Sequence, residues 1–197
     1  MGRIGWWLVA LTGCVLGLGS IPALGSEPEV FKVHAWEVGT YTSTPGESHD
    51  VFVLRVAEAL KTWTDETGTE ACGPIEQAKD GTFSVQLTTE KAQTVCLRST
   101  APVAGMTYTG DSIHSHPAAK NGGYTVRLKG QDLEALEALG QVKLVDDLRR
   151  FHIRTLPAEP DTFSDDDYAG GPGYLVVKGQ LLYQHGKGTA HEVASLP

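Results

Sequence analysis

The chain has 197 residues, 41% of them hydrophobic and 20% charged, a composition typical of a globular protein with one domain-sized core. Its formal net charge of -8 and its lack of a basic run exclude an electrostatic nucleic-acid binder. No internal repeat or long low-complexity tract divides the sequence. We therefore expect a single domain with no nucleic-acid partner.

Residues 1–25 have the pattern of a secretory signal peptide. Arg3 supplies a positive charge, residues 4–18 supply an apolar stretch, and Ala23-Leu24-Gly25 place small residues where a signal peptidase cleaves. We expect cleavage before Ser26 and export to the periplasm or out of the cell.

The mature chain is then a single domain over residues 26–197. One alternative is an uncleaved membrane anchor, but the apolar stretch is short for a bilayer span, and Gly17, Gly19 and Pro22 interrupt it. The other alternative is a lipoprotein anchored at Cys14, which ends a Leu-Thr-Gly-Cys run. The short signal before that cysteine disfavours lipidation, and we expect no membrane span.

Export also determines how the cysteines are interpreted. Cleavage leaves two of the three cysteines, Cys72 and Cys96. In an oxidising compartment an even pair is most simply a disulfide. Two buried free thiols are the alternative. Neither cysteine has a neighbouring group that would lower its pKa, so a catalytic cysteine is disfavoured.

The predicted elements form a mixed α/β domain in which a sheet packs against helices. Helical spacing of apolar residues indicates the first helix, and the alternation of Phe83, Val85 and Leu87 indicates a half-buried strand. In chain order we expect a strand over 30–36, a helix over 47–64 capped by Ser48, strands over 70–77, 82–88, 92–98 and 111–114, a helix over 131–148 broken at Gly140, a strand over 151–156, a helical turn from Ser164, and a hairpin of 174–177 and 181–184.

Two histidines in the run His114-Ser-His116-Pro117 are the first candidate site residues. Side chains two residues apart on a strand point to the same side, so one metal ion can reach both imidazoles. Taken alone, such a pair is more often a surface or packing feature.

The run 163–168 contains Ser164 and Asp167, which are three residues apart and project from the same side of a helix. A carboxylate from this turn would complete a two-histidine zinc site and leave the fourth position for water. The alternative is a helix cap within a solvated acidic surface.

Glu70 precedes Ala-Cys-Gly73 and is the candidate proton carrier. A hydrolytic zinc site needs a carboxylate outside the metal shell to pass a proton from water to the leaving amine. A glutamate that opens a strand is otherwise simply exposed, and Glu66, Glu76 and Glu90 are nearby alternatives.

Together, Glu-x-Cys-Gly, His-Ser-His-Pro, Ser-x-x-Asp and the final hairpin resemble the JAB/MPN (JAMM) metallopeptidase family, over about Val51 to Tyr183. The chain is especially similar to bacterial JAB-like domains associated with secretion and toxin systems. The resemblance implies a JAB/MPN-like mixed sheet with cytidine-deaminase-like layering and hydrolysis of a peptide or isopeptide bond in a peptide or protein substrate. It also implies roles for the site residues: zinc bound by His114, His116 and Asp167, Glu70 as general acid/base, and Ser164 donating to the oxyanion.

One departure from the family pattern is an insertion of 46 residues, 118–163, between the His-Ser-His-Pro and Ser-x-x-Asp motifs. The ends of an inserted element need only lie close together for Asp167 to reach the metal. The insertion supplies rival ligands in Asp132, Asp146, Asp161 and His152. A non-catalytic JAB-like binding or accessory module of a secretion or toxin system is the alternative function.

Overall fold

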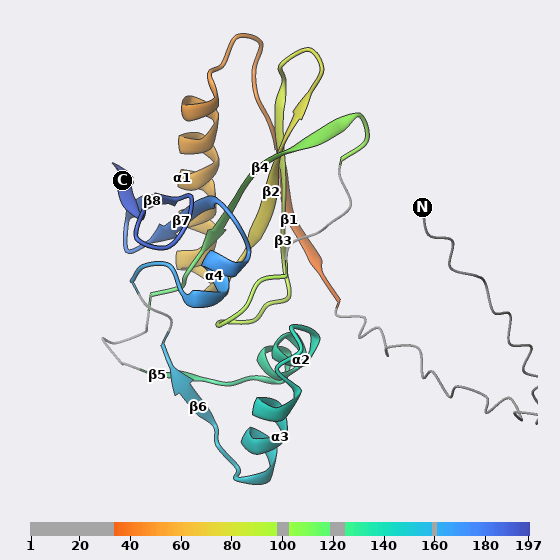
Figure 1. The fold of residues 1–197 in the computed structure, drawn as a ribbon, viewed down its shortest axis with the longest axis vertical. Helices are drawn as coiled ribbons and strands as arrows, with labels where there is room; N and C mark the ends of the chain where they lie inside the picture. Colours follow the sequence, from red (N-terminus) through yellow and green to blue (C-terminus); the bar gives the residue numbers. More distant parts are fainter. Residues whose placement is uncertain (1–33, 98–102, 119–124, 159–160) are drawn as a thin grey trace, which may run out of the picture. The chain divides into compact units, whose positions relative to one another are not determined.

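The computed structural model of the protein describes residues 34–97, 103–118, 125–158 and 161–197 (Figure 1). The signal peptide expected over 1–25, the possible lipid site at Cys14 and the start of the strand expected over 30–36 lie outside the described residues. Within those four ranges, no helix has the length and apolar character needed to cross a bilayer.

A seven-stranded sheet forms the framework, with the strand order β1-β3-β2-β4-β7-β8-β9. All neighbouring strands are antiparallel except β4 and β7, which are parallel. The predicted mixed α/β class is therefore confirmed. The strands are β1 (Trp36–Thr42), β2 (Cys72–Ala78), β3 (Phe83–Thr89), β4 (Met106–Ser115), β7 (Gly173–Val177), β8 (Gln180–Gln184) and β9 (His191–Ser195).

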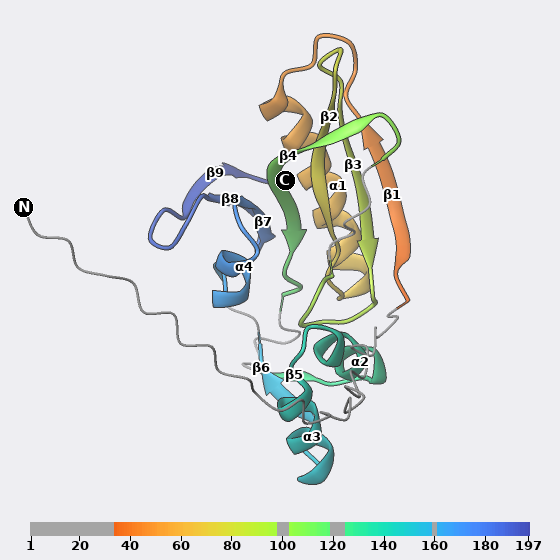
Figure 2. The ribbon, with the colours of Figure 1, turned by 45° about the vertical axis from the view of Figure 1, so that its right-hand side comes forward.

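Helix α1 (His49–Thr67) covers one face of this sheet (Figures 1 and 2). The Ser48 hydroxyl caps its first turn by accepting from the backbone N–H of Val51, as predicted. The helix runs to Thr67, three residues beyond its predicted end at 64, and Gly68 follows it in the left-handed conformation. The buried face of α1 packs against residues of β2, β3, β4, β7 and β8, and this cluster includes Phe52, Val53, Val56, Ala57, Leu60, Ile75, Val85, Leu87, Ile113, Val176 and Leu181.

The opposite face of the sheet carries the short helix α4 (Asp165–Ala169). Because side chains alternate along a strand, Val176 joins the cluster under α1 while Leu175 and Val177 pack with Phe163 on the other face. The same alternation in β4 sends Ile113 towards α1 and His114 to the side of α4. This second face therefore holds the candidate site.

The insertion folds as a small unit of β5 (Thr125–Arg127), α2 (Gly130–Ala138), α3 (Val142–Arg150) and β6 (Thr155–Pro157), in which β5 and β6 pair antiparallel. The predicted break at Gly140 is confirmed, and this residue has a φ of 81° that suits glycine. Ala135, Leu136, Val145 and Leu148 form a core with residues of the loop that follows β3.

Several predicted strand boundaries are wrong. No strand forms over residues 92–97, although the sequence predicted one over 92–98; this segment is a loop held at Ala92, whose carbonyl accepts from the N–H of Glu70 at 2.9 Å. Only residues 155–156 of the strand expected over 151–156 lie in a strand, β6, and α3 continues to Arg150.

The remaining differences extend the sheet. β1 begins at Trp36, where the predicted strand was to end. β4 starts five residues before the predicted strand at Asp111, and β9 was not predicted at all. These strands have mixed polar and apolar residues, and their formation depends on pairing with neighbours that the sequence does not identify.

The predicted disulfide is present: Cys72 and Cys96 are bonded across a separation of 24 residues, with their Cα atoms 5.9 Å apart. The bridge ties the start of β2 to the loop after β3. We expect the Cys72→Ser/Cys96→Ser double variant to lose about 3 kcal/mol of unfolding free energy, because the cross-link restricts the unfolded chain. Urea unfolding of wild-type and variant protein measures this, and equal midpoints would contradict it.

Candidate metal centre

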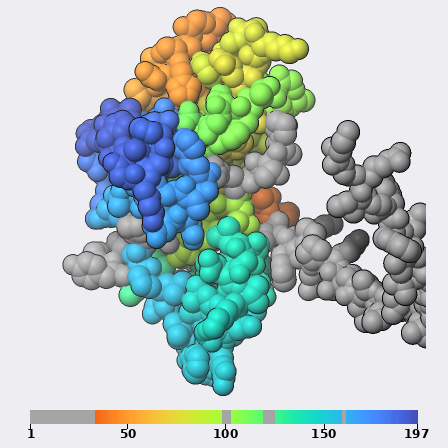
Figure 3. Space-filling view, in the orientation of Figure 1, coloured from red at the N-terminus to blue at the C-terminus, as the bar shows by residue number. Residues whose placement is uncertain are grey.

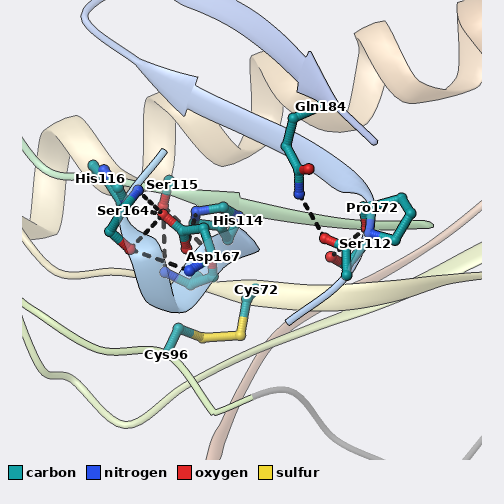
Figure 4. Close-up of polar contacts among 12 residues, drawn as sticks. Cys72, Cys96, Ser112, His114, Ser115, His116, Ser164, Asp167, Pro172 and Gln184 are labelled. Carbon is teal, nitrogen blue, oxygen red and sulfur yellow. Dashed lines mark hydrogen bonds and ion pairs between the residues drawn. A yellow bond between two sulfur atoms is a disulfide. The ribbon is translucent and has the colours of Figure 1, made fainter. Parts of the chain in front are cut away.

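The two histidines lie at the end of β4, next to α4 (Figure 4). His114 is in the strand, and the backbone N–H of His116 continues the pairing by donating to the carbonyl of Val176 at 3.0 Å. Their ring centroids are 5.1 Å apart. The side chain of His116 is 4% exposed and that of His114 is 14% exposed, so both imidazoles are largely withdrawn from solvent.

Asp167 reaches the histidines because of how α4 begins. Ser164 caps the helix, and Oδ2 of Asp167 accepts from the backbone N–H of Ser164 at 2.7 Å and from its hydroxyl at 2.8 Å. The N–H of Asp167 donates in return to the Ser164 hydroxyl at 3.2 Å. This reciprocal cap fixes the carboxylate and turns its other oxygen, Oδ1, towards His114.

The three side chains converge on one point. Nε2 of His114 lies 3.0 Å from Oδ1 of Asp167, and Nε2 of His116 lies 3.6 Å from Oδ2. One donor atom from each of the three residues falls within 4.8 Å of the others. Two donors of a tetrahedral zinc ion are about 3.4 Å apart, since each bond is about 2.1 Å long. The cluster can therefore hold a metal ion.

The buried Nε2 atom of His114 supports this interpretation. Despite its closeness to Asp167, it takes part in no hydrogen bond of acceptable direction among the described residues. Buried polar atoms nearly always have a partner, and a buried imidazole nitrogen that lies close to a carboxylate without a well-directed hydrogen bond suits a ligand to a metal. Two imidazoles and one carboxylate are also a common donor set for catalytic zinc.

The charge of Asp167 fits the same role. Burial raises the pKa of this carboxyl, but His114 beside it, the charge of His116 and the N–H of Ser164 together outweigh burial and hold the pKa well below its usual range. The carboxylate is therefore ionised at neutral pH and available as a metal ligand.

Glu70 lies just before β2, the strand that pairs with β4 and its residue His114. Cys72 pairs with His114, and the segment before β2 stays beside β4, since the carbonyl of Ala71 accepts from the N–H of Ser115 at 3.1 Å. Glu70 is the residue just before Ala71. Glu70 is 4% exposed and lines the same cavity as the two histidines and Asp167. Its main-chain carbonyl accepts from the hydroxyl of Thr89 at 2.6 Å, which fixes the backbone there.

The other glutamates considered as proton carriers are engaged or exposed elsewhere in the structure. Glu66 is exposed on α1. Glu76 is buried at the far part of the cavity and accepts from the N–H of Val103, while Glu90 accepts from the N–H of Leu97. Burial raises the pKa of Glu90 more than this hydrogen bond lowers it.

The rival metal ligands in the insertion do not join the centre. Asp132 is buried and caps α2, Asp146 and His152 are exposed, and Asp161 pairs with Lys178. The only group of three metal-ligating side chains within the described parts of the chain is the one that contains Asp167.

The hydroxyl of Ser164 has a single hydrogen, and the structure directs it to Asp167. This hydroxyl can donate to a substrate oxygen only by giving up that bond. Its predicted role as an oxyanion donor therefore competes with its role in holding the carboxylate.

The sequence analysis did not predict the buried hydrogen bonds of Ser115, the residue between the two histidines in the chain. Ser115, whose side chain points away from the centre, has its hydroxyl 2.6 Å from that of Thr64 on α1 and accepts from the N–H of Ala71 at 3.3 Å. It thus joins β4, α1 and the segment after Glu70. The alternation of the strand would have identified Ser115 as an inward-facing polar residue, but not its partners.

Close packing of β2 against β3 explains why a glycine, Gly73, follows Cys72. A Cβ atom on Gly73 would lie 2.4 Å from the carbonyl oxygen of Gln86, so only glycine fits where β2 and β3 approach. This packing positions the strand that begins just after Glu70.

A cavity of about 930 Å³ opens over the centre. It runs from the histidines past the disulfide to Met106 and Tyr108 on β4. Its walls combine carboxylates with apolar side chains, and it is large enough for several residues of a peptide.

No family model, curated protein or solved structure matches this chain.

Proposed function

We propose that the protein is an exported zinc-dependent amide hydrolase of the JAB/MPN (JAMM) type, acting on a peptide or isopeptide bond. The convergence of His114, His116 and Asp167 within 4.8 Å carries the proposal. Its support is the burial of Glu70 beside these residues, in a cavity that can admit a peptide. The mixed sheet with a helix on one face and the site on the other is compatible with a JAB-like fold.

The residues divide the chemistry between them. Zinc, when bound, acts as a Lewis acid that brings the pKa of a coordinated water to about 7. The Glu70 carboxylate accepts a proton from water and returns it to the nitrogen of the leaving amine. Ser164 orients Asp167 in the ground state, and its hydroxyl would donate to the oxygen of the amide only by giving up its bond to Asp167.

Export is supported by the disulfide, which persists in oxidising compartments such as the periplasm. The expected signal peptide at 1–25 is consistent with it and remains a prediction.

Metal content and proteolysis test the proposed function together. We expect the purified protein to contain about one zinc per chain by elemental analysis. Incubated with a diverse peptide library, zinc-loaded protein should generate new termini detectable by mass spectrometry, and chelator-treated protein should not. Zinc binding without any cleavage would favour the non-catalytic module, and a protein that binds no zinc would contradict the metal centre itself.

A further inference from the structure

Among the apolar side chains that line the cavity together with the candidate metal ligands are Val95, Leu97, Leu139 and Phe163. They come from three separate segments, which are the loop after β3, the end of α2, and the residue before Ser164. A single exposed leucine such as Leu139 is common on protein surfaces and does not by itself indicate a binding site. That segments far apart in the sequence bring these side chains, here called the apolar wall, to a cavity that contains the candidate metal ligands is more informative.

The apolar wall lies close to the centre. The ring centroid of Phe163 is 6.0 Å from that of His114. Cys72 is the cross-strand partner of His114. The Cα atom of Cys96, which forms the disulfide with Cys72, lies 5.9 Å from the Cα atom of Cys72. Val95 and Leu97 flank Cys96, so their Cα atoms lie within about three strand spacings of that of His114.

The insertion is fixed to this wall. Oδ1 of Asp132, a fully buried residue of α2, accepts from the N–H of Gln93 in the loop at 2.6 Å. Ala135 and Leu136 of α2 share a core with Ala92 and Val95 of the same loop. Figure 3 shows the teal atoms of the insertion beside the yellow-green atoms of the loop. Leu139, just after α2, is therefore held at the cavity although 44% of its surface is exposed.

We propose that this wall is a subsite for an apolar side chain that flanks the scissile amide, with Leu139 as a specificity-determining residue supplied by the insertion. The inference rests on the proposed function. The occupant must be apolar, because side chains on this wall offer it apolar surface, and the carboxylates of Glu70, Asp166 and Asp167 in the same cavity disfavour an acidic group. The insertion would thus act in substrate selection rather than in metal binding.

Two hydroxamates test the subsite without a known substrate, since both bind zinc through the same head group. We expect hexanohydroxamate to bind zinc-loaded protein at least about tenfold more tightly than acetohydroxamate by calorimetry, because each buried methylene group contributes about fourfold in affinity. In the Leu139→Ser variant this preference should fall by at least threefold, while the affinity for acetohydroxamate stays unchanged.

Val142→Ser is the matched control. Val142 belongs to the same insertion and is 42% exposed, but it does not line the cavity. This variant should keep the wild-type preference for hexanohydroxamate. Equal binding of the two hydroxamates by wild-type protein, or an unchanged preference in Leu139→Ser, would overturn the subsite alone. If neither compound binds the zinc-loaded protein, the metal-centred function fails together with the subsite.

Discussion

Replacing Asp167 by asparagine should weaken zinc binding by at least about 100-fold, the upper end of the loss seen when a group outside the metal shell is removed. Asparagine retains an oxygen that can accept from the N–H and hydroxyl of Ser164, so α4 keeps its cap. What disappears is the negative charge beside His114 and His116. Competition against a chromophoric chelator measures the affinity of each protein.

The neighbouring residue provides the control for this experiment. Asp166 lies on the same short helix and lines the same cavity, but it offers no atom to the group of donors. The Asp166→Asn variant removes the same charge from nearly the same place, so we expect wild-type zinc affinity. If both variants lose affinity equally, the effect is general electrostatics and Asp167 is not a ligand.

The second large effect concerns Glu70. The Glu70→Gln variant should retain about one zinc per chain and lose hydrolysis by about 100- to 10,000-fold, because glutamine cannot carry the proton from water to the leaving amine. The measurement pairs elemental analysis with the initial rate on a peptide identified from the library. Loss of both zinc and rate would instead make Glu70 a ligand or a structural residue.

Glu76→Gln is the matched control for Glu70→Gln. Glu76 belongs to β2, is 1% exposed and lines the same cavity, but six residues of extended chain put it roughly 20 Å from Glu70. Glutamine can still accept from the N–H of Val103. The rate of this variant should match that of the wild type, and a comparable loss would show that any buried charge in the cavity affects turnover.

The sequence predicted those elements whose signals are local. The helix after Ser48 has a capping residue and regularly spaced apolar residues, and the turn at Lys178-Gly179 joins two strands of β-branched and aliphatic residues. The segment 92–97 misled the prediction because its apolar residues serve a different purpose. Val95 packs on the insertion and Cys96 forms the disulfide, so neither depends on strand pairing.

The residues of the candidate site were predicted from the order of their motifs along the chain, because a sequence gives no distance between side chains. His114 and His116 required only the period of a strand. Bringing Asp167 to them across the insertion required the parallel pairing of β4 with β7, which no local pattern reveals. The apolar wall was harder still to predict, since Leu139 and Val95 are 44 residues apart in the sequence and come to the same cavity only through tertiary packing.

Two of the three hydrophobic cores within the described residues, one beneath α1 and one joining the insertion to the loop after β3, have no residue in common. The sheet that presents the histidines has a core of its own, but the disulfide and the bond from the N–H of Glu70 to the carbonyl of Ala92 couple it to the loop on which the insertion packs. Volume-conserving substitutions in the second core should therefore leave the core beneath α1 intact. Engineered grafts at 125–157 that keep Asp132, the partner of Gln93, would change the cavity lining at Leu139 while the core beneath α1 is retained.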